Sequence, residues 1–365
     1  MSGGPAAQGA ERPRRLHLHA WHRQRGATFV VRRGTELPAR YGDAEAELAR
    51  LRDGCALVDQ SDCGRLELLG ADRARFLNGL VTVDVVRLVE GEALRGWAAD
   101  VKGRILADLT VLHCGDRLWL ATPPGRAELL REHLLRYRVA DRVEVLAMDD
   151  LLPLTLAGGG LAGALAGAGV EVPPAVAPPR RSHWRAELFG SEVHLERSDR
   201  LGVPGMRVWV SSSIASLVAD ELCARLGAAP VGDDACDVAR LEAGIARFGV
   251  DFDERNLPGE VDVEGTVDWR KGCYLGQEVV ARLHYRGQPA RLLRRLRLAG
   301  DRVPEPGEEV SSEERAAGTV TSAARSPRHG VLAIALVQRR AAEPGTTVAL
   351  AGGGEARVEE LTPLG

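Results

Sequence analysis

The pattern of apolar and polar positions predicts short strands mixed with helices over the first half of the chain. Segments 28–32, 56–60, 65–69, 93–99, 104–113, 117–121 and 142–146 read as strands, and segments 44–52 and 127–136 as helices. A further helix is expected to begin near Asp72 and to bury Phe76, Leu77 and Leu80. Because most strand links are short, an α+β arrangement with antiparallel neighbours is favoured over a parallel doubly wound sheet.

The second half of the chain repeats this texture and then changes. Residues 157–180 are rich in Gly, Ala and Pro, which predicts a linker or a long surface loop. Strands near 192–196 and 206–211 and helices at 213–226 and 233–246 follow. From residue 291 onward, short alternating segments between Gly/Pro turns are typical of a small antiparallel barrel. We expect a disordered tail at 1–27, one lobe at 28–150, a second at 151–287 and the barrel at 288–365.

Composition narrows the class of protein. The chain has 365 residues, 45% of them hydrophobic, which suffices for two or three cores. A net charge of −3 argues against direct nucleic-acid binding, and no apolar run reaches the length of a membrane span. The six cysteines form no C-x-x-C pair, so we predict no metal site and expect reduced thiols in a cytoplasmic protein.

One cysteine lies in unusual surroundings, in the segment Lys271-Gly272-Cys273-Tyr274-Leu275-Gly276-Gln277-Glu278. Gly272 and Gly276 allow left-handed turns and close backbone approach. Arg270, Lys271 and a helix expected to begin near Gln277 would lower the pKa of the Cys273 thiol. A lone cysteine is usually core filler, but this density of Gly, Lys, Gln and Glu favours a reactive thiol. The other cysteines lack such neighbours and read as structural: Cys55, Cys63, Cys114, Cys223 and Cys236.

This octapeptide resembles the signature of the folate-binding YgfZ family, in the superfamily of GcvT-like aminomethyltransferases. Three further segments are similar to T-protein blocks: residues 76–85 (FLNGLVTVDV), residues 240–251 (RLEAG followed by FGVD) and residues 318–322 (GTVTS). Together the matches cover most of residues 28–355. The resemblance identifies the chain as a member of this superfamily and implies its iron–sulfur-cluster maintenance branch.

The resemblance implies a cloverleaf of two ferredoxin-like α+β lobes and a small antiparallel β-barrel around a pocket for tetrahydrofolate or a one-carbon derivative. Arg240 matches the family arginine that faces the folate, which suits a guanidinium because it pairs with carboxylates and stacks on flat rings. The alternative is a helix-surface arginine paired with Asp237 or Glu242. Asp108 matches the aspartate that orients the reacting folate nitrogen, and its alternative is a solvent-facing strand residue.

Two departures from the T-protein pattern put methylene transfer in doubt. The loop before Asp108 carries Arg104 and Ala107 where the T-protein has Gly and a first Asp. Arg207 occupies the position of the T-protein glutamate that holds the pterin, and arginine has no hydrogen-bond acceptor. Glu260 and Asp251 are candidate substitutes. The resemblance also implies that Gly272, Gly276, Gln277 and Glu278 contribute to the folate site.

Three hypotheses follow. The first is a tetrahydrofolate-binding protein that supports assembly or repair of iron–sulfur proteins, with Cys273, Asp108 and Lys271 as catalytic residues and cluster client or assembly proteins as partners. The second is a glycine-cleavage aminomethyltransferase, so a folate-dependent transferase activity stays open. The third is a non-catalytic folate-binding scaffold that indirectly supports tRNA modification.

Overall fold

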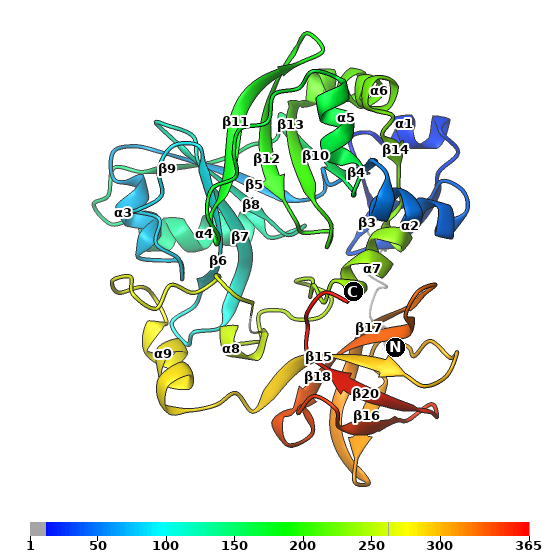
Figure 1. Cartoon of the computed structure of the whole chain (residues 1–365). Coiled ribbons are helices and arrows are strands. Elements are labelled where there is room, and N and C mark those ends of the chain that lie inside the picture. The colour runs from blue at the N-terminus through cyan, green and yellow to red at the C-terminus, as the bar shows by residue number, and fades with distance from the viewer. Residues whose placement is uncertain (1–11, 262, 365) are drawn as a thin grey trace, which may run out of the picture.

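The computed structural model describes residues 12–261 and 263–364 (Figure 1). Two α+β lobes lie side by side in the upper part of Figure 1, and a β-barrel lies below them. The predicted fold class is therefore confirmed, and the chain has the GcvT-like architecture. Within these ranges, no helix combines the length and the apolar character needed to cross a membrane.

The first lobe is an antiparallel half-sheet covered by two helices. Its strands, in spatial order, are β6 (Glu92–Ala99), β7 (Ile105–His113), β8 (Leu118–Thr122), β5 (Gly64–Leu69) and β9 (Glu144–Ala147), and its helices are α3 (Arg73–Asn78) and α4 (Ala127–Tyr137). Phe76, Leu77 and Leu80 enter the core beneath these helices, as predicted. Asp72 lies at the N-cap, but its carboxylate accepts from the Arg142 backbone N–H at 3.0 Å instead of capping the helix.

The second lobe continues the same sheet. Its strands are β14 (Ala229–Pro230), β4 (Ala56–Asp59), β10 (Leu151–Ala157), β13 (Gly205–Ser211), β12 (Ser191–Ser198) and β11 (Arg181–Leu188). A 3-10 turn, η1 (Ser212–Ile214), leads into α6 (Ala215–Leu226). The expected linker at 157–180 is wrong in part, because α5 (Leu161–Gly167) forms there and buries Leu161 and Leu165. These two side chains lie one helical turn apart, so they share the face that packs on the core.

Strand pairing crosses the lobe boundary that the sequence suggested. Segment β4 was assigned to the first lobe, yet it pairs with β10 and β14 of the second. In the described part of the chain, the strand pairing that links the two half-sheets is that of β11 with β6, through Arg181 opposite Ala93 and Ser182 opposite Glu92. We call this junction the seam. The lobes are therefore two halves of one 11-stranded sheet joined by a short contact.

The N-terminal segment is structured from residue 12 onward, which corrects the predicted tail. It contains β1 (Arg14–Arg15), α1 (His19–Gln24), β2 (Thr28–Arg32) and β3 (Thr35–Arg40), followed by α2 (Ala44–Asp53). Leu16, Leu18 and Trp21 are buried. Apolar packing therefore fixes this segment on the rest of the protein, although it contains many basic residues. Residues 1–11 of the predicted tail lie outside the described residues.

The helix predicted at 233–246 is shorter. Helix α7 (Asp233–Glu242) ends before Gly244, whose φ of +69° lies outside the range of a right-handed helix. The Ile245 backbone N–H returns to the Arg240 carbonyl at 2.8 Å and satisfies it. This early end places Arg240 in the last turn of the helix, with the chain wrapping back over it.

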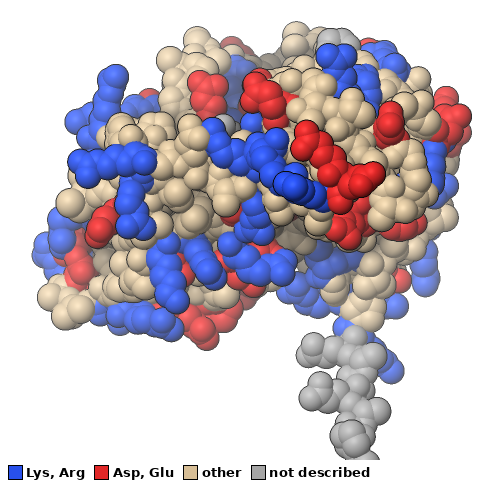
Figure 2. Space-filling view, turned by 90° about the horizontal axis from the view of Figure 1, so that it is seen from below, with Lys and Arg blue, Asp and Glu red and all other residues tan. Residues whose placement is uncertain are grey.

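Two short helices and a closed barrel complete the chain. The helices are α8 (Pro258–Val261) and α9 (Gln277–Arg286). The barrel order is β15 (Arg291–Leu298), β18 (Gly330–Gln338), β17 (Arg315–Ser326), β16 (Glu309–Ser312), β19 (Thr347–Leu350) and β20 (Glu355–Glu359), with the 3-10 turn η2 (Arg339–Ala341). The predicted barrel is confirmed. Figure 2 views the molecule from below, and the face that it shows carries acidic side chains among basic ones.

Candidate functional site

A cavity of about 150 Å³ lies where both lobes, the N-terminal sheet and α7 converge. We call it the central cavity. Its lining includes strand residues from β4, β7, β8 and β13, the turn after β2, and the loop that follows α7. Five arginines and four aspartates line it: Arg33, Arg200, Arg207, Arg240, Arg247, Asp59, Asp62, Asp108 and Asp233. This lining offers both donors and acceptors to a polar, anionic ligand.

Arg240 faces the central cavity, where the sequence comparison had placed a folate-facing arginine. Its Nε donates to Asp237 at 2.8 Å, and its Nη1 donates to Asp251 at 2.7 Å and to the Ile245 carbonyl at 3.3 Å. The side chain is 1% exposed, so the alternative of a helix-surface arginine is wrong although the Asp237 pair exists. Its buried Nη2 has no hydrogen-bond partner among the described residues.

Asp251 binds Arg240 but does not belong to the cavity lining that the structure describes. Its carboxylate accepts from Arg240, from the Arg247 backbone N–H at 2.8 Å, and from the hydroxyls of Thr321 and Ser322 at 2.8 and 2.5 Å. The last two belong to the GTVTS segment of the barrel. Asp251 therefore positions the arginine and ties it to the barrel, instead of replacing the pterin-binding glutamate.

Asp108 lies in the cavity wall, but it does not face solvent as the alternative had it. Arg95 donates to both of its oxygens at 3.0 and 2.8 Å, and Arg200 pairs with it from the other side. Burial by itself raises the pKa of Asp108, yet the two guanidinium groups outweigh it and lower the pKa to about 2. A carboxylate with this pKa stays ionised and is a weak base, so it suits electrostatic positioning better than proton removal.

Arg207, which the resemblance put in place of the pterin-binding glutamate, lines the central cavity. Its Nη1 donates to the buried Glu196 at 3.2 Å, and its Nε is buried without a partner in the described part of the chain. Asp62, in the turn after β4, is an acid of the cavity wall. Burial raises the pKa of Asp62 to about 6, against the lowering effect of Arg33.

The unpartnered atoms test whether a folate would fit. Within residues 12–261 and 263–364, four buried polar atoms of cavity-lining residues lack hydrogen bonds: Arg33 Nε, Asp62 Oδ2, Arg207 Nε and Arg240 Nη2. Leaving a buried polar atom unsatisfied costs about 1–3 kcal/mol. Three are donors and one is an acceptor, which suits a ligand that carries both carboxylates and ring N–H groups. The residues present therefore fit the implied cofactor.

The predicted cysteine site forms a separate loop, residues 266–276, which we call the cysteine loop. The ammonium group of Lys271 is bound by backbone carbonyls. Its Nζ donates to three backbone carbonyls of the first lobe, those of Asn78, Val81 and Val83, at 2.6–2.8 Å. Burial lowers the pKa of Lys271 to about 8. This lysine clamps the loop onto residues 78–83, the segment that resembles the N-terminal T-protein block.

Gly276 anchors the other end of the cysteine loop. It has a φ of +79°, and a Cβ added there would lie 2.3 Å from the Asp100 carbonyl oxygen and 2.8 Å from the Gly103 Cα. Gly103 is equally constrained by Gly276 and by Val279 and Val280 of α9. Backbone therefore packs on backbone at the turn between β6 and β7, which only glycine permits. The helix expected near Gln277 is confirmed, since α9 begins there.

Cys273 itself is exposed, in contrast to the other five free cysteines. Gly272 is also exposed, with open space around the position of a Cβ. The described cavity lining includes none of the residues predicted to form one site with Arg240, namely Lys271, Gly272, Cys273, Gly276, Gln277 and Glu278. Glu260 also lies outside that lining and accepts from Asn256 at 3.0 Å and from Arg291 of the barrel at 3.1 Å. The predicted site is thus two sites.

Sequence reasoning missed several cavity residues. Asp62, Arg33 and Arg200 were not singled out, and Cys63 and Cys236 were read only as structural, although both line the cavity. Burial raises the pKa of Cys63 to about 11, so its thiol stays neutral. The available signal was the pair Asp59 and Asp62 at the end of a predicted strand, where polar side chains gather at an edge. Arg33 and Arg200 gave no local signal.

The fold and the cavity define a class: an α+β protein with one sheet shared by two lobes, a barrel beneath and a charged cavity at their centre. Residues 18–271 match the GCVT N-terminal domain, and residues 291–361 match the glycine cleavage T-protein C-terminal barrel domain. The chain therefore belongs to the glycine cleavage T-protein family. The two matches leave out residues 272–290, which contain Cys273 and α9.

Individual relatives carry two different names. The chain is 28% identical over 333 residues to an aminomethyltransferase of Deinococcus deserti, covering 90% of each chain. It is also 28% identical over 340 residues to the tRNA-modifying protein YgfZ of Cronobacter sakazakii, covering 90% of this chain and 97% of that one. The solved aminomethyltransferase T of Bartonella henselae has the same fold, with a TM-score of 0.87 at 23% identity over 95% of this chain and 97% of that one.

Proposed function

We propose that this chain binds tetrahydrofolate, or a one-carbon derivative of it, in the central cavity and supports the assembly or repair of iron–sulfur proteins. The observation that carries the folate half is the set of unpartnered buried atoms around the cavity, led by Arg240 Nη2. The iron–sulfur half rests on the complete octapeptide around an exposed Cys273. This combination favours the branch of the family to which YgfZ belongs, and a cytoplasmic location goes with it.

The cavity residues divide the work of holding the ligand. Asp62 is the acceptor for the N–H edge of a flat ring, because its buried Oδ2 accepts no hydrogen bond within the described residues and has a 3.8 Å ion-pair contact with Arg33 Nη2. Arg240 Nη2 and Arg207 Nε are donors for ring oxygen or carboxylate groups, and a guanidinium offers them in a fixed plane. Arg33 Nε adds a further donor for the anionic end of the ligand.

Bound tetrahydrofolate would supply a carrier for one-carbon units. Asp108 holds its negative charge at neutral pH and sets the field along the cavity wall. Cys273 works outside the cavity, on a client or assembly protein that reaches the loop from solvent, since its side chain is exposed. An accessible thiol can ligate a soft metal ion or attack an electrophile.

Calorimetric titration with tetrahydrofolate tests the first half. Wild type should bind one equivalent, and Arg240→Lys should bind at least about tenfold more weakly, because lysine keeps the charge but loses the planar fork. Arg295→Lys is the matched control, since Arg295 is equally buried but lies in the barrel and pairs with Glu359. Absence of heat with folded wild type would refute the folate half.

Genetic complementation tests the second half. In a strain that lacks the gene, the wild-type chain should restore the activity of iron–sulfur enzymes, and Cys273→Ala should not. Cys223→Ala serves as the control, because Cys223 is a partly exposed free cysteine on α6, away from the loop. Full rescue by Cys273→Ala would refute the role of the thiol.

Aminomethyl transfer is the second candidate, favoured by the names of several relatives. Two residues oppose it: Arg207 in place of an acceptor and Asp108 held between two arginines. Folate-dependent release of ammonia from the aminomethyl-lipoyl carrier by the purified chain would establish this activity. Saturable folate binding with neither ammonia release nor rescue of iron–sulfur enzymes would instead indicate a scaffold.

A further inference from the structure

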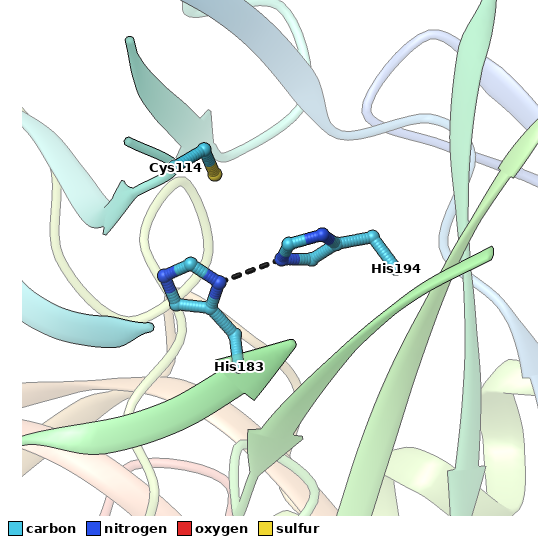
Figure 3. Close-up of side chains that lie close together, drawn as sticks. All are labelled: Cys114, His183 and His194. Carbon is cyan, nitrogen blue, oxygen red and sulfur yellow. Dashed lines mark hydrogen bonds between the residues drawn. The ribbon is translucent and has the colours of Figure 1, made fainter. Parts of the chain in front are cut away.

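Three potential metal ligands from separate strands meet beside the seam (Figure 3). Cys114 follows β7 of the first lobe, His183 lies on β11 and His194 on β12 of the second. One ligand atom from each lies within 4.8 Å of the other two, and Figure 3 shows the side chains pointing toward one another. We propose that these residues form a zinc site that clips the two lobes together.

The hydrogen bonds prepare the two imidazoles for this role. His183 Nε2 donates to the Glu92 carbonyl at 3.0 Å, so His183 Nδ1 keeps its lone pair. In the metal-free protein this lone pair accepts a hydrogen bond from His194 Nε2 at 2.6 Å, which a bound metal would replace. A carbonyl that accepts the second ring N–H is the usual way in which a metal-binding histidine is oriented. His194 Nδ1 is buried without a partner in the described part of the chain, so this ring can exchange its N–H between nitrogens.

The two imidazoles are close to the spacing that zinc needs. Two imidazole nitrogens bound to tetrahedral zinc at ~2.0–2.1 Å lie roughly 3.3 Å apart. The two rings must therefore separate by less than about 1 Å from their present contact. Sulfur and imidazole are the donors that zinc prefers, and three protein ligands leave the fourth position to solvent.

The hydrogen bond between the two rings bears on their protonation state. A bond between two imidazole nitrogens requires that one of them carries no proton, so at least one ring is neutral. Neutral imidazole is the form that binds metal. Burial raises the pKa of the Cys114 thiol to about 12. On binding, the S–H bond breaks, its proton leaves to solvent, and a sulfur–zinc bond forms without any redox change.

The location explains what such a clip would do. Among the described residues, the ladder between β11 and β6 contains two residue pairs. His183 directly follows Ser182, the last of them, and its backbone N–H donates to the Gly91 carbonyl at 2.8 Å. Trp119 packs edge-on against His194 with ring centroids 4.8 Å apart, which shields the cluster on one side. A zinc ion held by β11, β12 and the end of β7 would add a cross-link where the strand pairing is weakest. This inference is independent of the folate and iron–sulfur proposals.

Cobalt(II) titration tests the site. We would use the full chain without an affinity tag, carrying Cys273→Ala to remove the exposed thiol. One equivalent of Co²⁺ should give intense tetrahedral ligand-field bands and a thiolate-to-cobalt charge-transfer band. Cys114→Ser should abolish the charge-transfer band, and His194→Gln should weaken binding at least about tenfold. The matched controls Cys223→Ser and His133→Gln, at a partly exposed cysteine and a buried histidine elsewhere, should leave both signals unchanged.

Zinc should also raise the melting temperature of this protein by about 5 °C at 100-fold excess over its dissociation constant. If Cys114→Ser fails to fold, X-ray absorption of the zinc-loaded protein replaces it, with one sulfur and two imidazole ligands expected. A folded protein with a weak octahedral cobalt spectrum would overturn the proposal. A charge-transfer band that survives Cys114→Ser, or a zinc shell of oxygen and nitrogen only, would overturn it as well.

Discussion

The central cavity and the cysteine loop use charged side chains in opposite ways. Around the cavity, Arg240 and Arg207 are fixed by acidic partners and still keep buried donor atoms without a partner among the described residues. In the loop, the ammonium of Lys271 is committed to three carbonyls, and the thiol of Cys273 is exposed. The cavity is therefore organised to receive a ligand, whereas the loop is organised to present one side chain to solvent.

The difference also separates the two sites in their tolerance to change. Loss of a cavity residue removes both a ligand contact and a buried ion pair. Loss of the thiol removes a reactive group but no contact that holds the loop, because the loop is held by Lys271, Gly276 and backbone contacts. Four sets of substitutions sharpen this contrast.

The largest effect is expected at Asp251. Asp251→Ala removes a fully buried carboxylate that holds Arg240, Thr321 and Ser322. We expect the free energy of unfolding to fall by about 3–5 kcal/mol, because the buried arginine loses a partner. Urea titration measures it, and folate affinity should fall as well. Asp301→Ala, at an exposed surface ion pair, is the control and should change neither value. Equal effects of both substitutions would contradict a central role for Asp251.

The second effect contrasts two glycines of one motif. Gly276→Ala forces a Cβ to 2.3 Å from the Asp100 carbonyl oxygen at a φ of +79°, whereas Gly272→Ala meets nothing within 4 Å. The free energy of unfolding should fall by about 2–4 kcal/mol for the first and stay within about 0.5 kcal/mol for the second. Thermal and urea unfolding would measure both. If the two substitutions destabilised the chain equally, the anchoring role of Gly276 would be wrong.

The third effect has the opposite sign. The folded-state pKa of Asp62, about 6, lies above the ordinary value of 3.8, so ionisation of this carboxylate destabilises the fold increasingly as the pH rises from about 4 to 6, and by a constant amount above that. Asp62→Asn should raise the free energy of unfolding at pH 8 by about 2–3 kcal/mol, and the gain should shrink as the pH falls through 6 toward 4. Folate affinity should drop in the same variant. A gain that does not depend on pH would show that the cause is not ionisation.

The smallest effect on stability is expected at Cys273. Cys273→Ser should change the free energy of unfolding by no more than about 0.5 kcal/mol, because the side chain is exposed. Folate affinity should also match that of wild type, since the thiol lies outside the cavity wall that the structure describes. Urea titration and calorimetry measure the two quantities. A clear loss of folate affinity would show that the thiol and the central cavity belong to one site.

The sequence by itself determined much of the architecture. Periodicity within single segments placed most strands and the barrel, because the alternation of buried and exposed positions is a local property. Short links between strands predicted antiparallel neighbours, as found for β6, β7 and β8. Motif resemblance assigned Arg240 and Arg207 to ligand-binding positions, and both line the central cavity. The segment FLNGLVTVDV was also recognised, although its contact with Lys271 was not.

The tertiary structure alone decided which of these features share a site. The pairing of β4 with β10, the clamp of Lys271 on residues 78–83 and the cluster of Cys114, His183 and His194 join segments far apart in the chain. No local pattern encodes such contacts, since each depends on how the sheet and the helices pack together. For the same reason the motif around Cys273 could be recognised in the sequence, while its separation from the central cavity could be seen only in the fold.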